Sequence, residues 1–232
     1  KLLKQNNLIN FKMKNFHFHP MIKMIVEFPE NVNTEISPDV ISDQIINFYP
    51  NYIFGNAASG LPFLLIPSYK NRRIYNYIKK NFKNMTIFHS TFSFGSGKLF
   101  KIPFINDLLI KYSFNDKKLN IVHEGVENLL KFAFMSGAKK CYLLDNNITE
   151  ITKQDYYNKN YSIIPKNFNF SSVHLLGGFI VKDQNISEFG KINNENIFIN
   201  DSSLISYDLL KNPQGTLMAL CKRNIIENIK KI

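Results

Sequence analysis

The chain has 232 residues and lacks any long apolar run. A helix that spans a bilayer needs about 20 consecutive apolar residues. The longest apolar run near the start, residues 21–28, is interrupted by Lys23 and Glu27. The first residues also lack the charged, apolar and small-residue regions of a signal peptide. We therefore expect no transmembrane segment.

Cysteine is scarce, with only two residues, Cys141 and Cys221. Two cysteines cannot form a disulfide framework or supply the spacing of a metal site, although one disulfide remains open. Cys141 precedes the apolar residues 142–144, so we expect it to be a small buried thiol. This cysteine usage fits a reducing, cytoplasmic compartment.

Nucleotide-binding loops are missing from the sequence. No G-x-G-x-x-G segment occurs, which excludes a complete nucleotide-binding enzyme of Rossmann type. Residues 95–98 read GSGK but lack the first glycine of a phosphate loop and the following Ser or Thr, so a turn is expected there. His17 and His19 would share one face of a strand, yet no cysteine or carboxylate lies at ligand spacing. We therefore expect no metal site.

The chain is strongly basic, with 29 Lys and Arg, 18 Asp and Glu, and a formal net charge of +11. Such a charge is typical of proteins that bind nucleic acid or anionic membranes. The lysines are scattered as separate pairs, and the richness in Lys, Asn, Ile, Phe and Tyr matches the bias of an AT-rich genome. We therefore expect no nucleic-acid partner, and keep a non-catalytic basic nucleic-acid-binding module as the alternative.

Hydrophobic periodicity predicts a mixed fold with a sizeable core. Strands are expected at residues 21–28, 85–94, 110–114, 141–144 and 197–200, and helices at 69–83, 119–136 and 213–230. The helix at 119–136 has the strongest apolar spacing and is followed by Gly137. Residues 145–170 are polar and expected to form a loop.

The last helix has clear start signals. Asn212 is expected at its N-cap and Pro213 at its first helical position. Its expected buried stripe consists of Leu217, Leu220, Ile225 and Ile229.

Three motifs follow one another in the last sixty or so residues of the chain. Residues 171–178 read SSVHLLGG and contain His174. Residues 196–204 read NIFINDSSL and contain Asp201 and Ser202. Residues 212–220 read NPQGTLMAL and begin with Asn212. Three ordered motifs are far more specific than any one of them alone.

This order resembles the C-terminal signature of the glucose–methanol–choline oxidoreductases, including cholesterol oxidases and long-chain alcohol oxidases. The family signature is a His-x-x-Gly, a strand ending in Asp-x-Ser, and an Asn-Pro-x-x-Thr helix. The resemblance extends loosely upstream, to residues 1–3, to the His-Pro within residues 16–20, and to the helix that ends at residues 136–138. Leu175, Phe179 and Ser206 depart from the residues usual in the family.

The resemblance implies an FAD-dependent oxidation of an alcohol. His174 would be the base that removes the hydroxyl proton, and Asn212 would hold the same oxygen through its amide. The residues implied to contact the cofactor are Asp201, Ser202, Asn212, Pro213 and Gln214. The many Phe and Ile residues before position 115 fit an apolar or sterol-like alcohol, and equally fit a protein core.

The resemblance also implies the domain organisation. The expected fold class is α+β, with residues 1–170 forming a substrate-binding domain of antiparallel sheet and helices. Residues 1–15 would be a remnant of the FAD-binding domain, and residues 171–232 would return to that α/β domain with a strand and a helix. The family's glycine fingerprint would precede Lys1, so the chain is expected to be a fragment that lacks the N-terminal FAD-binding segment and is inactive alone.

Overall fold

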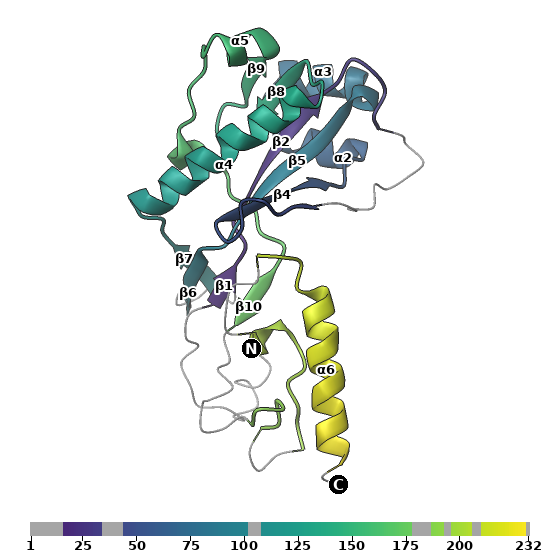
Figure 1. Cartoon of the computed structure of the whole chain (residues 1–232), viewed down its shortest axis with the longest axis vertical. Helices are drawn as coiled ribbons and strands as arrows, with labels where there is room; N and C mark the ends of the chain where they lie inside the picture. Colours follow the sequence, from purple (N-terminus) through teal and green to yellow (C-terminus); the bar gives the residue numbers. More distant parts are fainter. Residues whose placement is uncertain are drawn as a thin grey trace. The chain divides into compact units, whose positions relative to one another are not determined.

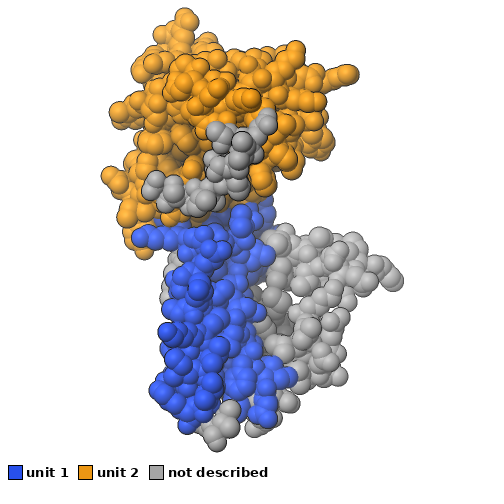
Figure 2. All heavy atoms as spheres, turned by 90° about the vertical axis from the view of Figure 1, so that its right-hand side faces the viewer, with its two compact units in different colours: residues 1–19, 93–113, 172–232 blue, residues 20–92, 114–171 orange. Residues whose placement is uncertain are grey.

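The computed structural model describes residues 16–33, 44–101, 108–177, 187–192, 196–205 and 210–230. The chain divides into two compact units, coloured separately in Figure 2. Unit 1 comprises Lys1–His19, Ser93–Ser113 and Ser172–Ile232, and unit 2 comprises Pro20–Phe92 and Phe114–Ser171. The described residues form a mixed α+β structure with two antiparallel sheets and five α-helices. The α+β expectation is confirmed at this level.

Unit 2 is built on a six-stranded antiparallel sheet with strand order β3-β4-β5-β2-β8-β9. Its strands are β2 (Met21–Glu27), β3 (Gln44–Ile45), β4 (Tyr52–Ala57), β5 (Met85–Phe92), β8 (Lys140–Leu143) and β9 (Thr149–Thr152). Its helices are α2 (Leu61–Leu65), α3 (Arg72–Asn81), α4 (Asp116–Met135) and α5 (Lys153–Tyr157), with single 3₁₀ turns η1 (Ile66–Ser68), η2 (Phe82–Asn84) and η3 (Pro165–Asn167). Figure 1 shows how these helices are arranged around the sheet.

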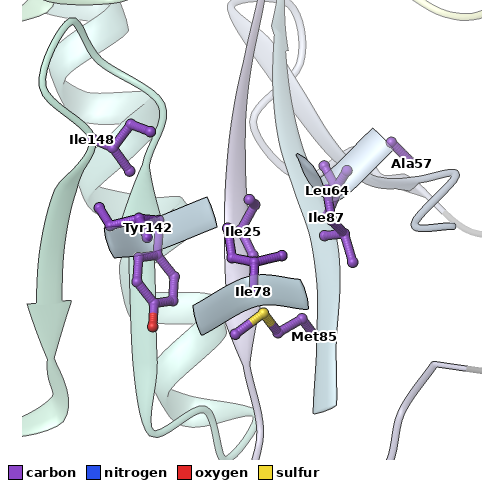
Figure 3. Packing of buried hydrophobic residues seen from close by; sticks show 9 residues of the cluster. Ile25, Ala57, Leu64, Ile78, Met85, Ile87, Tyr142 and Ile148 are labelled. Carbon is purple, nitrogen blue, oxygen red and sulfur yellow. The ribbon is translucent and has the colours of Figure 1, made fainter. Parts of the chain in front are cut away.

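One face of this sheet packs against α2 and α3. Ile25 pairs in register with both Ile87 and Tyr142, so the three side chains point to the same face. Leu64 from α2 and Ile74 and Ile78 from α3 join them in one buried cluster, drawn in part in Figure 3. The helix α3 begins after Asn71, whose side chain accepts a hydrogen bond from the Ile74 N–H at 3.2 Å.

The other face of the sheet packs against α4. The side chain of Asn115 accepts a hydrogen bond from the Lys118 N–H at 3.0 Å and thereby caps this helix, and Gly137, with φ of +97°, follows its end. A Cβ added at Gly125 would lie 2.7 Å from the Phe92 ring, so glycine allows α4 to approach β5 closely. Because helices cover both faces, β2 is buried along almost its whole length.

Unit 1 contains a smaller four-stranded antiparallel sheet with strand order β10-β1-β6-β7. Its strands are β1 (Phe16–Phe18), β6 (Gly95–Lys101), β7 (Leu108–Tyr112) and β10 (Leu175–Gly177). The turn expected at residues 95–97 is wrong, because these residues begin β6. A Cβ at Gly97 would lie 2.7 Å from the Phe16 ring on the neighbouring strand, so this glycine serves close packing rather than a turn.

Unit 1 also contains the helix α6 (Gln214–Ile229) and the 3₁₀ turn η4 (Ser202–Leu204). Ile192, Ile199 and Leu204 form a small buried cluster with the partly buried Leu220 of α6. Gly190 has φ of +78°, and a Cβ there would lie 2.3 Å from the Ile199 carbonyl oxygen. Only glycine fits this position without strain.

The predicted buried stripe of α6 is wrong. Ile225 and Ile229 are 51% and 64% exposed, and Leu217 and Leu220 are only partly buried. The buried side chain of this helix is Asn224. Its Oδ1 atom accepts a hydrogen bond from the Arg223 guanidinium at 3.0 Å, and its Nδ2 group donates to the Asn200 Oδ1 atom at 3.1 Å. Apolar spacing alone could not show that this helix packs through an amide network.

Two further sequence expectations are corrected. Residues 145–170 contain β9, α5 and η3 rather than a loop, and the Thr152 hydroxyl and Asp155 carboxylate form the capping box that starts α5. Residues 197–200 form no strand, because only an isolated bridge joins Phe198 to Lys191. The strands expected near 21–28, 85–94, 110–114 and 141–144 and the helices expected near 69–83 and 119–136 are confirmed.

Some expectations fall outside the described residues. These are the features expected for residues 1–15, the glycine at position 178, and the departures at Phe179 and Ser206. Within the part of the chain that the structure describes, no helix is long and apolar enough to cross a membrane. Cys141 is buried and free, as expected, and Cys221 is also free.

The chain passes from one unit to the other at residues 19–20, 92–93, 113–114 and 171–172. The expected division into residues 1–170 and 171–232 stays a prediction. Unit 1 contains the residues before Pro20, and it also contains Ser93–Ser113, which the sequence placed in the substrate-binding domain. The substrate-binding and flavin-binding roles of the two units stay predictions.

Candidate functional site

His174 directly precedes β10 and contacts a second histidine. Its Nδ1 atom lies 3.2 Å from the Nδ1 atom of His19, the residue that follows β1. The two rings meet edge to face, with centroids 5.3 Å apart and an interplanar angle of 79°. Pairing of Phe18 with Leu175 brings the ends of β1 and β10 together and so sets this contact.

The geometry of the pair restricts its protons. Two imidazole nitrogens can share a hydrogen bond only when one ring donates and the other accepts. If both rings were protonated, two N–H groups would point at each other, so this contact requires at least one neutral ring. The Nε2 atom of His174 has no hydrogen-bond partner among the described residues, so this nitrogen is available for other chemistry.

The environment of His174 favours a neutral ring. Partial burial lowers its pKa below the usual value, and charge on His19 lowers it further. An imidazole with a lowered pKa stays unprotonated at neutral pH and can accept a proton there.

Asn212 lies just before α6, with its amide oriented by the start of that helix. Its Oδ1 atom accepts a hydrogen bond from the Gln214 N–H at 3.1 Å. Since this N–H group requires an acceptor, the amide must place its NH₂ group on the opposite side. Within the described ranges the Asn212 Nδ2 group has no hydrogen-bond partner, and the residue is exposed. Asn212 therefore presents two N–H donors outward.

The start of α6 differs by one residue from the prediction. Pro213 occupies the N-cap position and Gln214 is the first helical residue, whereas Asn212 was expected at the N-cap and Pro213 inside the helix. Pro213 itself is buried and offers no side-chain cap, and Asn212 supplies the capping oxygen from one position earlier. The first turn leaves N–H groups without partners inside the helix. A Cβ added at Gly215 would have nothing within 4 Å, so the backbone there is open.

Asp201 and Ser202 occupy the start of η4. The Asp201 Oδ1 atom accepts hydrogen bonds from the Ser203 N–H, at 2.8 Å, and from the Ser203 hydroxyl. Asp201 is exposed, and its Oδ2 atom has no hydrogen-bond partner in the described part of the chain. The carboxylate is thus oriented by its own turn, with one oxygen left to accept a donor.

All of these predicted site residues belong to unit 1, and β10 and η4 are in contact within it. Across the described residues, no hydrogen bond joins His174 to Asn212. His19 was missed as a partner of His174, although the sequence had drawn attention to it twice, in the His17 and His19 pair and in its His-Pro. No group of three or more His, Cys, Asp or Glu residues that could hold a metal ion occurs among the described residues.

Unit 2 contains a buried histidine, His89, which lies in β5 and is 4% exposed. Its Nδ1 atom lies 3.1 Å from the Thr91 hydroxyl. Burial, aided by the positive charge of Lys23, lowers the pKa of His89 to about 4. The ring of His89 is therefore neutral in the folded protein near pH 7.

We expect unit 2 to lose stability as the pH falls from the ordinary histidine pKa toward the lowered one. A lowered histidine pKa contributes stability that is present above about 6.5 and lost as the pH falls toward the folded value, and the shift corresponds to about 3 kcal/mol. Urea unfolding at about pH 7 and about pH 4 measures this loss. His89→Gln should reduce the loss, whereas the exposed His123→Gln should leave it unchanged. An equal loss in wild type and His89→Gln would contradict the assignment.

Unit 2 also contains an apolar pocket of about 210 Å³ beside α4. Its described lining consists of Ile45, Phe54, Gly55, Asn56, Phe88, Leu129 and Phe132. Asn56 is the one residue with a polar side chain in this lining. The pocket suits a small apolar group.

No protein-family model matches the chain, and no curated protein matches it.

Proposed function

We propose that the chain is the C-terminal part of an FAD-dependent alcohol oxidoreductase of the glucose–methanol–choline family. The observation that carries the proposal is the ordered set of motifs around His174, Asp201 and Asn212, which matches the family signature in residue type and order. The side-chain environments of these residues support it, because each leaves one reactive atom without a partner in the described structure.

His174 is the proposed base. Oxidation of an alcohol removes a proton from oxygen while a hydride leaves the adjacent carbon. With Nδ1 engaged by His19, Nε2 is the nitrogen that would take the hydroxyl proton. The lowered pKa of His174 keeps this nitrogen unprotonated at neutral pH.

Asn212 is the proposed partner for the substrate oxygen. As the proton leaves, negative charge grows on this oxygen, and an oriented N–H donor stabilises that charge. The Asn212 NH₂ group is such a donor, because the helix start holds its Oδ1 atom. The proposal requires His174 and Asn212 to act on the same oxygen.

The cofactor proposed for this chain is FAD, which would supply the acceptor for the hydride at its N5 atom. The donor set at the start of α6 fits such a group, because N–H donors and the positive end of a helix dipole favour the electron-rich edge of a reduced flavin. The residues that would hold it are Asp201, Ser202, Asn212, Pro213 and Gln214. The free Asp201 Oδ2 atom would accept a hydrogen bond from a hydroxyl of the cofactor chain.

The proposed substrate is a small-molecule alcohol with an apolar body. The observation that favours an apolar body is the richness in Phe and Ile before position 115.

The experiment that tests the function uses the full-length gene product. The gene should encode a G-x-G-x-x-G segment before Lys1, and the purified protein should carry flavin. Under anaerobic conditions, primary, secondary and sterol alcohols should be screened for loss of the flavin's visible absorption. The corresponding alkanes are the controls. A protein without flavin that binds RNA with a steep salt dependence would instead support the basic binding module.

A further inference from the structure

A second histidine, His19, is buried in contact with His174. His19 is 1% exposed, and its Nδ1 atom contacts the Nδ1 atom of His174 at 3.2 Å across 155 positions of the chain. The preceding strand β1 is paired on both edges, by β10 and by β6. Phe18 is buried beside the Tyr112 ring, with ring centroids 5.4 Å apart. Pairing on both edges and this packing hold the backbone that leads into His19.

We infer that His19 is a positioning residue that holds His174 in the tautomer with hydrogen on Nδ1 and a free lone pair on Nε2. The inference rests on the proposed function, because the contact itself fits either ring as donor and only the tautomer with hydrogen on Nδ1 leaves Nε2 free to act as a base.

The reason lies in what each tautomer of His174 can do. If His174 carries its hydrogen on Nδ1, it donates to His19 and its Nε2 atom can accept a proton. If His19 donates instead, His174 must carry its hydrogen on Nε2 and cannot act as a base through that atom. When His174 accepts a proton on Nε2, its Nδ1–H remains bonded to His19, so the contact persists through the transfer and becomes charge-assisted.

Other ionisable groups do not replace His19 in this role. The elements that pack against β10 carry His17 on β1 and Asp201 at the start of η4. Within the described residues, neither of them forms a hydrogen bond with His174, and the charge found to act on the pKa of His174 is that of His19. The backbone contact of His174 is to the Ser172 hydroxyl, at 3.1 Å, and leaves the ring free.

Two variants of His19 distinguish its hydrogen bond to His174 from its role in packing. His19→Asn keeps an oxygen acceptor near the place of Nδ1, whereas His19→Leu has a similar size and no acceptor. His17→Leu, on the partly exposed neighbour in β1, is the control for loss of a nearby imidazole.

The first measurement is the ¹⁵N chemical shift of the His174 ring nitrogens in this chain, labelled at histidine. Wild type and His19→Asn should show hydrogen on Nδ1, and His19→Leu should lose this preference. His17→Leu should resemble wild type. The inference is overturned if the His174 tautomer is the same in all four proteins, or if wild type carries the hydrogen on Nε2.

The second measurement is the rate of flavin reduction by alcohol in the flavin-loaded full-length protein. His19→Leu should reduce the rate by about 10–100-fold, and His19→Asn should recover most of it. Equal rates in wild type and His19→Leu would overturn the positioning role. If wild type shows the expected tautomer but reduces no flavin with any alcohol, the proposed function fails while the tautomer assignment stands.

Discussion

His174→Gln in the flavin-loaded full-length protein is expected to slow flavin reduction by an alcohol by about 10²–10⁴-fold. The variant keeps a polar side chain of similar length but has no nitrogen that can accept the hydroxyl proton. Flavin content should stay unchanged, because the implied cofactor contacts lie at residues 201–202 and 212–214. Rapid-mixing absorbance under anaerobic conditions measures the rate, and the ratio of flavin to protein measures retention.

The pH dependence of the same reaction provides an independent test. Because the pKa of His174 is lowered, its proton-accepting form should persist below about pH 6.5, and the rate should fall only at lower pH. His123→Gln, on the exposed face of α4, is the matched control and should behave as wild type. Loss of flavin from His174→Gln with no change in rate per bound flavin would show that His174 is structural.

Glu27→Ala is expected to lower the free energy of unfolding of unit 2 by roughly 2–5 kcal/mol. The Glu27 side chain is 1% exposed at the end of β2. It accepts hydrogen bonds from the hydroxyls of Tyr77 and Tyr142, at 2.9 and 3.1 Å, and pairs with the Lys139 Nζ at 2.8 Å. Removal of the carboxylate leaves the buried Tyr142 hydroxyl without its acceptor and opens a cavity under α3. Urea unfolding at neutral pH measures the change.

The control for this prediction is Glu30→Ala, which removes an exposed carboxylate three residues later and should change stability little. The stability of unit 2 at high pH supplies a second test. Burial and the Glu27 carboxylate raise the pKa of both Tyr77 and Tyr142. A raised pKa contributes stability that is lost as the pH rises above about 10. The prediction is contradicted if Glu27→Ala unfolds at the same urea concentration as Glu30→Ala.

Much of unit 2 could be predicted from sequence, because its signals are local. The apolar spacing along α4 and the apolar run of β2 each reflect burial by neighbouring layers, and Gly137 follows the helix as a stop signal. The stretch containing β9 and α5 was missed because its Asn and Tyr content outweighed the Thr152 and Asp155 capping box.

The candidate site residues could also be found from local sequence. The motifs around His174, Asp201 and Asn212 are contiguous in sequence, and the amide of Asn212 is oriented by a residue only two positions away. The chemistry proposed for these residues therefore follows from their types and order.

What the sequence alone determined is the set of local elements and the identity of the candidate reactive groups, because helix periodicity, capping and short motifs depend on residues a few positions apart. The tertiary structure decided which side chains meet. The contact between His19 and His174, the need for glycine at position 97 and the burial of Asn224 in α6 all depend on strands or turns paired across long stretches of chain. Such contacts arise from the register of pairing, which no local pattern specifies.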